Sequence, residues 1–229
     1  MDRALAAAAK RGDLAACQWL HATFATTSAD VYKRALRYAV KRGHLAVCRW
    51  LHAVAVPDAR ADHNWALRRA AANGHLAVCR WLHATYGLTP ADARDDNNYA
   101  LKSAAENGHL DVCQWLHAVF KLGREDARAA DNYALRWAAA NGHLDVCQWL
   151  HAVFKLDRED ARAKNSCALY WAAMYNHVDV YMWLYVTFRL EPADWTTGSS
   201  FVHPAIAARV RRLTLTARLR ALAGELTAE

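Results

Sequence analysis

The sequence predicts an all-α protein, a solenoid of about six helix–turn–helix repeats. The spacing of apolar residues within each repeat is that of an α-helix. The composition, with 55% hydrophobic and 22% charged residues and only 9 Gly and 4 Pro in 229 residues, disfavours a β-sandwich and a disordered chain. The repeat itself is marked by tryptophans that lie 31 or 34 residues apart, at Trp19, Trp50, Trp81, Trp115, Trp149 and Trp183.

The clearest repeat spans residues 131–156, DNYALRWAAANGHLDVCQWLHAVFKL. Its Leu135, Ala138 and Ala139 have the i, i+3, i+4 spacing of one buried helix face. Asp131 and Asn132 stand where the N-cap of this first helix would lie. The helix is expected to end at Gly142 in the left-handed conformation, and the corresponding residue of the sixth repeat is Asn176, which tolerates the same conformation.

A second helix is predicted after the turn, with Asp145 in its first turn, where a negative charge complements the helix dipole. Its buried side is expected to hold Leu144, Cys147, Trp149, Leu150 and His151.

Neither helix is long enough to bury its apolar stripe alone, so the repeats must stack. Pairs of Ala before the turn, such as Ala70-Ala71 and Ala138-Ala139, are what close helix packing requires. Residues 191–229 are expected to form a linker and a C-terminal helix that caps the array. We expect the array to occupy residues 1–190, with units that open near Ala4, Ala35, Ala66, Ala100, Ala134 and Ala168.

The run AA-x-x-GHL-[DA]-V-x-x-x-L, present at residues 70–82, 104–116 and 138–150, resembles the ankyrin-repeat family. Such divergent arrays are similar to those of large DNA viruses and protists. The resemblance implies that the turn His forms hydrogen bonds between repeats and that the inner helices line a concave binding face. The usual Thr-Pro-Leu-His opening is replaced by Tyr133-Ala134-Leu135-Arg136, which argues against a regular β-hairpin between repeats.

Charge is unevenly distributed, with a net charge of +8 over residues 1–80, −4 over 81–200 and +3 over 201–229. If the inner helices line the binding face, that face changes from basic to aromatic along the chain. The alternative is that the basic side chains are merely solvated and the aromatic ones pack between repeats. The predicted partner-binding residues are Lys10, Arg11, Arg37, Lys41, Arg42, Arg68, Arg69, Lys102, Arg136, Trp137, Tyr170, Trp171 and Tyr175.

Other chemistry finds little support in the sequence. His and Cys recur along the second helix, as in His44-Cys48-His52, but one helix face supplies too few ligands for a closed zinc site. Equivalent Cys in stacked helices are too far apart for disulfides, so we expect them to be buried thiols, with Cys167 as the exposed candidate. The paired carboxylates Glu125-Asp126 and Glu159-Asp160 recur in equivalent loops, which indicates a structural or surface role and not an active site. We expect no enzyme activity and no cofactor.

The predicted function is a non-catalytic scaffold, a monomer that binds another protein through its groove and inter-repeat loops. One alternative is nucleic-acid binding by the basic N-terminal half and the Arg-rich C-terminal helix. A minor alternative is a ubiquitin-ligase adaptor that uses the C-terminal helix. No apolar run is long enough to span a membrane, and no signal peptide is recognisable, so we expect a cytoplasmic protein, in the host cytoplasm if it is viral.

Overall fold

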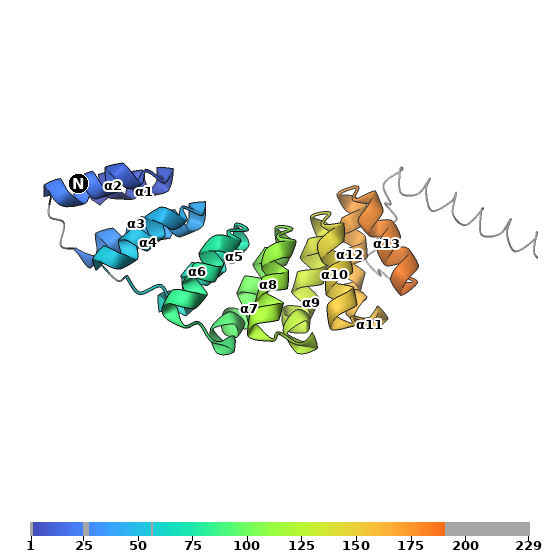
Figure 1. Cartoon of the computed structure of the whole chain (residues 1–229). Helices are drawn as coiled ribbons and strands as arrows, with labels where there is room; N and C mark the ends of the chain where they lie inside the picture. The colour runs from blue at the N-terminus through green and yellow to red at the C-terminus, as the bar shows by residue number, and fades with distance from the viewer. Residues whose placement is uncertain (1, 25–27, 56, 191–229) are drawn as a thin grey trace, which may run out of the picture. The chain divides into compact units, whose positions relative to one another are not determined.

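The computed structural model describes residues 2–24, 28–55 and 57–190. Within these residues it contains thirteen helices and no β-strand, as the sequence predicts (Figure 1). None of these helices is both long and apolar enough to cross a membrane. The linker and C-terminal helix expected over residues 191–229, with the capping and adaptor roles assigned to them, lie outside the described residues.

The described residues divide into two compact parts, one that ends at Ala134 and one that begins at Leu135. In the first part, α1, α3, α5 and α7 pack against one another in order and form an inner layer, while α2, α4, α6 and α8 form an outer layer. The four helix pairs are α1 (Asp2–Arg11) with α2 (Leu14–Phe24), α3 (Ala29–Arg42) with α4 (Leu45–Ala55), α5 (Ala61–Ala72) with α6 (Leu76–Tyr86), and α7 (Pro90–Glu106) with α8 (Leu110–Phe120).

Helix α9 (Arg124–Ala140) contains the boundary between the two parts. In the second part, α13 packs on α10, α11 and α12. The helices of this part are α10 (Leu144–Phe154), α11 (Arg158–Ala161), α12 (Ala163–Met174) and α13 (Val178–Phe188).

The turns at Gly12, Gly43, Gly74 and Gly142 are each covered by the His ring of the following repeat. Gly43 has φ +76°, and the ring of His75 covers it so closely that a Cβ there would lie 2.5 Å from Nδ1. Nε2 of His75 donates a hydrogen bond to the Lys41 carbonyl at 3.0 Å, and His44 makes the same bond to the Lys10 carbonyl at 3.1 Å. The predicted left-handed turn and the predicted His bridge between repeats are therefore both confirmed.

Four repeats enter their first helix through three consecutive residues in the left-handed region, at 62–64, 96–98, 130–132 and 164–166. Each such residue other than Gly costs about 1–2 kcal/mol, and least for Asn or Asp. Asn64, Asn98 and Asn132 occupy the third, buried position of this turn. Asp131 and Asn132 therefore belong to a left-handed turn, and the N-cap placement expected for them is wrong.

Four of the second helices, α6, α8, α10 and α13, end in a further left-handed residue that is followed by a buried Leu. Lys121 and Lys155, at φ 53° and 51°, end α8 and α10. The next residues, Leu122 and Leu156, are each only 2% exposed. Nδ1 of His117 donates to the Leu122 carbonyl at 2.9 Å, so the second histidine of the repeat holds the chain as it leaves the helix.

The core between repeats consists of small side chains and Leu. Leu135, Ala138 and Ala139 are fully buried, as predicted, and so are Cys147 and Leu150 of α10. The predicted burial of Leu144, Trp149 and His151 is only partial. The Trp149 ring packs edge-on against Phe154, with ring centroids 5.4 Å apart.

An ion-pair ladder joins the loops of successive repeats. The tripeptide Asp-Ala-Arg recurs at residues 58–60, 92–94, 126–128 and 160–162. Nη2 of Arg60 donates to both carboxylate oxygens of Asp92 at 2.9 Å. Nε and Nη2 of Arg94 donate to the two oxygens of Asp126 at 2.8 and 3.0 Å. Asp126 also accepts from the Gly123 N–H at 2.8 Å. Of the paired carboxylates, Asp126 thus caps a helical turn and binds the preceding repeat, whereas the Glu125 side chain is 88% exposed.

We predict a graded response to Ala at three glycines. Gly43→Ala combines left-handed strain with a clash against His75, so the free energy of unfolding is expected to fall by about 3 kcal/mol. Gly87 has φ +58° but open space around it. Gly87→Ala is therefore expected to lower the free energy of unfolding by about 1–2 kcal/mol. Gly123 has neither a left-handed φ nor a close neighbour. The free energy of unfolding of Gly123→Ala is therefore expected to lie within about 0.5 kcal/mol of the parent value. Urea denaturation measures all three, and equal losses would contradict the role of the His contact.

A second prediction concerns Asp126. Burial alone would raise the pKa of this carboxyl, but the hydrogen bonds from Arg94 and Gly123 outweigh it and hold the pKa below its usual value. A carboxyl with a lowered folded-state pKa adds stability above its unfolded pKa, near 4, and that stability is lost as the pH falls through the folded value. Asp126→Asn is expected to cost about 1–2 kcal/mol at pH 7 and progressively less as the pH falls below about 4.

The matched control is Glu159→Gln. The Glu159 side chain is 78% exposed, and its contact with Arg162 is 3.6 Å long. Urea midpoints across the pH range should show almost no effect of this control at any pH. A pH-independent loss in Asp126→Asn would refute the electrostatic contribution.

Candidate functional site

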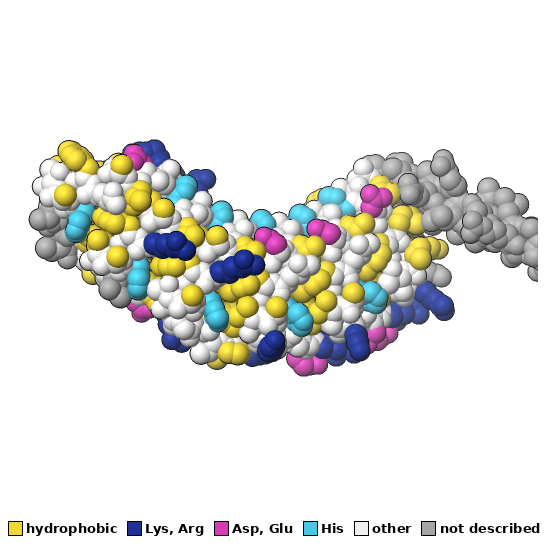
Figure 2. Space-filling model, in the orientation of Figure 1, with side chains coloured by type: hydrophobic (Ala, Val, Ile, Leu, Met, Phe, Trp, Pro, Cys, Tyr) yellow, Lys and Arg dark blue, Asp and Glu magenta, His cyan; other side chains and the backbone are white. Residues whose placement is uncertain are grey.

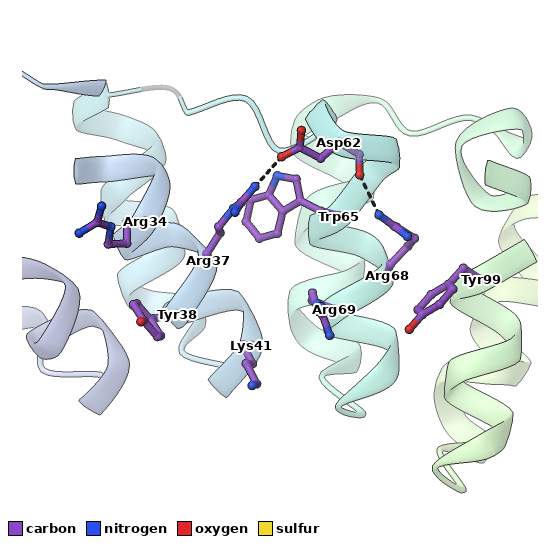
Figure 3. Close-up of a pocket in the computed structure, with 9 residues that line it drawn as sticks. All are labelled: Arg34, Arg37, Tyr38, Lys41, Asp62, Trp65, Arg68, Arg69 and Tyr99. Carbon is purple, nitrogen blue, oxygen red and sulfur yellow. Dashed lines mark hydrogen bonds and ion pairs between the residues drawn. The ribbon is translucent and has the colours of Figure 1, made fainter. Parts of the chain in front are cut away.

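The candidate site is a groove over the inner helices of the first part, with a volume of about 590 Å³. Helices α3, α5 and α7 supply its walls (Figure 3). It is lined by Arg34, Arg37, Tyr38, Lys41, Asp62, Trp65, Arg68, Arg69 and Tyr99. We call this the basic groove, because five of these side chains are cationic and only one is anionic.

Two of the five cations are bound within the protein. Arg37 forms an ion pair with Asp62 at 2.5 Å, and Lys33 approaches the same carboxylate at 3.6 Å. Arg68 pairs with Asp96 at 2.5 Å and donates to the Asp62 carbonyl at 2.8 Å. Both carboxylates lie in the left-handed turn of the following repeat, so the turn geometry places them beside the preceding helix.

The other three cations, Arg34, Lys41 and Arg69, are exposed and form no ion pair within the described residues. Figure 3 shows Asp62 at one end of the basic groove with Arg37 and Trp65, whereas Lys41 and Arg69 lie closer to the turns. The groove therefore has a neutralised end and an end with excess positive charge.

The aromatic faces in this region are covered by cations. The Arg37 guanidinium lies 5.4 Å from the centroid of Trp65, and that of Arg68 lies 5.1 Å from Tyr99. Lys102 lies 5.9 Å from Tyr99 and 5.5 Å from Tyr133. Burial lowers the pKa of Lys102, and Asp96 partly offsets this effect.

A smaller hollow of about 350 Å³ adjoins the basic groove, since Arg34 and Tyr38 line both. Its other charged residues, Arg3 and Lys10, come from α1. Lys10 is exposed and has no ion pair in the described part of the chain.

The structure brings some of the predicted site residues together. Arg37, Lys41, Arg68 and Arg69 meet in the basic groove, and Lys10 lines the adjoining hollow. Arg11 and Arg42 are exposed at the ends of α1 and α3 and line neither hollow, while Lys102 is half-buried on α7.

The remaining predicted residues lie in the second part, where Arg136, Trp137, Tyr170 and Trp171 are half-buried. Tyr170 packs edge-on against Trp171, which stacks on Tyr175 with ring centroids 5.3 Å apart. Tyr175 is 54% exposed. These rings form a separate aromatic cluster on and just beyond α12.

Sequence reasoning missed several residues of the basic groove. Arg34, Trp65 and Tyr99 each directly precede an Ala-Leu pair, so an alignment of the repeats at that position would have identified them. Asp62 was missed because the left-handed turn that presents it has no simple sequence signature.

The recurring His and Cys side chains have structural contacts. His52 Nδ1 donates to the Tyr86 hydroxyl at 3.0 Å, and that hydroxyl donates to the Pro57 carbonyl. The six cysteines are free thiols, and Cys167 is partly exposed. Burial raises the pKa of Cys48 and Cys79 to about 12, which suppresses the reactive thiolate. Within the described residues no three His, Cys, Asp or Glu side chains are grouped to hold a metal ion.

Comparison with known proteins agrees with the repeat architecture. A family model described as ankyrin repeats (3 copies) matches residues 5–88 and 101–194, and a second, ankyrin repeats (many copies), matches residues 67–117. No curated protein matches the chain. Because the matched ranges cover well over half of the sequence and coincide with the helix pairs, the chain belongs to the ankyrin-repeat family.

Proposed function

We propose that this protein is a non-catalytic scaffold that holds a segment of a partner protein in the basic groove. Ankyrin repeats generally mediate protein–protein interaction, which gives the class of function. The observation that carries the proposal is the set of unpaired cations, Arg34, Lys41 and Arg69, on helices whose opposite faces are fully buried.

The rigidity of these helices supports a binding role. Arg34, Lys41 and Arg69 belong to α3 and α5, which also contribute Leu36, Ala39 and Ala70 to the core. The backbone of a packed helix is already ordered, so binding there avoids the entropy cost of ordering a loop. We propose the exposed Tyr175 and the half-buried Trp171 on which it stacks as a second contact region, because aromatic rings are frequent anchors at interfaces.

Nucleic-acid binding is the second candidate, and the net charge of +8 over residues 1–80 favours it. Electrostatic binding to a phosphate backbone weakens steeply with salt. A gel-shift titration at rising salt tests this candidate, and no shift at low salt would exclude it. We further propose a monomer in the reducing cytoplasm, where free thiols persist.

The scaffold proposal predicts that Lys41→Glu with Arg42→Glu weakens capture of the native partner in a pull-down, because the pair reverses the charge of Lys41, which lines the basic groove, and of its exposed neighbour in the sequence. The thermal unfolding midpoint should stay nearly unchanged, since both side chains are exposed.

The matched control is Arg49→Glu with Arg80→Glu, which changes the net charge equally on the exposed surface of α4 and α6. Figure 2 shows the face that these outer helices form, on which the Lys and Arg side chains over α4 and α6 stand apart from one another. If the control weakens capture as much as the groove variant, or if neither variant does, the groove assignment is wrong.

A further inference from the structure

We infer that the basic groove binds an extended acidic peptide segment, with side-chain carboxylates paired to Arg34, Lys41 and Arg69. This inference rests on the proposed scaffold function and adds the chemistry of the partner. It draws on the groove's own carboxylate, on the distribution of the unpaired cations and on the covered aromatic faces.

Asp62 shows which ligand chemistry the groove accepts. Its carboxylate lies against Arg37 at 2.5 Å and Lys33 at 3.6 Å, and it is the only anionic side chain that lines the groove. One end of the groove thus already holds a carboxylate between cations. Toward the turns, Lys41 and Arg69 project into the same groove with no anionic partner among the described residues (Figure 3).

The distribution of the unpaired cations favours an extended ligand. Lys41 and Arg69 lie in the basic groove, Arg34 lies at its junction with the adjoining hollow, and Lys10 lies in that hollow. These four charges come from α1, α3 and α5, three successive inner helices. A single compact anion reaches only one such group of cations, whereas carboxylates at several positions of an extended chain can reach all of them.

The aromatic residues favour a peptide over single-stranded nucleic acid. Proteins that bind single strands stack bases on open aromatic faces. Here Arg37 covers Trp65, which is only 6% exposed, and Arg68 covers Tyr99. Among the aromatic residues that line the groove, Tyr38 alone is substantially exposed, at 38%. The groove therefore offers cations without the stacking surface that bases need.

The test uses the full chain and a fluorescent peptide of about 12 residues, which spans roughly 40 Å when extended. Glu occupies every second position with Ser between, and the control peptide has Gln in place of Glu. Anisotropy titrations are run at about 50 mM and 500 mM salt, because exposed charge pairs are strongly screened at the higher concentration. A single-stranded RNA of equal charge serves as the competitor.

Two variants change the groove in opposite directions. Lys41→Glu with Arg69→Glu is expected to weaken binding of the Glu peptide about tenfold or more, since two attractions become repulsions. Asp62→Asn is expected to tighten binding about threefold, because it frees Arg37 for the ligand. Asn tolerates the left-handed conformation at position 62. Arg49→Glu with Arg80→Glu again provides the control with equal net charge, and circular dichroism verifies that each variant is folded.

The inference is supported if the Glu peptide binds in preference to the Gln peptide, if the two groove variants shift its affinity in opposite directions, and if the control variant has little effect. It is overturned if the Gln peptide binds equally well, if Asp62→Asn weakens binding, or if the RNA displaces the peptide at much lower concentration. The two proposals can also fail separately. If capture of the native partner requires Lys41 but the protein shows no preference for the Glu peptide, the acidic-segment inference is overturned and the scaffold proposal stands.

Discussion

The structure depends on close contact between successive repeats, because no helix pair can bury its own apolar face. Small residues make this contact possible: Ala138 and Ala139 are fully buried, and a residue larger than Gly at position 43 would collide with the ring of His75. The same His donates to the Lys41 carbonyl of the preceding repeat. One Gly and one His therefore provide both the close packing at the turn and the hydrogen bond to its carbonyl group. This explains why Gly and His recur together along the array.

This contact between repeats also determines the charge of the surface. Arg60 and Arg94 each bind an Asp of the following repeat, and Arg37 binds Asp62 in the same way. These side chains neutralise one another and stabilise the stack. The cations left without a carboxylate are the ones available to a partner, so the basic groove is defined as much by the ion pairs inside the array as by its own composition.

Periodicity predicted much of the fold. The helices, the left-handed turn at Gly142 and the buried Ala pairs follow from local spacing and conformational preference, which recur in every unit. The left-handed entry to the first helix was not predicted, and Asp131 was placed at an N-cap instead. Three consecutive left-handed residues are unfavourable by local preference. Contacts such as that of Asn64 with Asp95, 31 residues away, accompany this conformation.

The sequence by itself determined the small residues and Leu that are buried between repeats, because a helix of fixed pitch places every third or fourth residue on the same face. It also located the basic stripe that contains Arg37, Lys41 and Arg69. Only the tertiary structure decided which of these charges remain free. Arg37 is neutralised by Asp62, which lies 25 residues later in the chain and comes within reach only when the next repeat stacks. The spacing of residues within one repeat does not predict this ion pair, because the pair depends on how two repeats pack against each other.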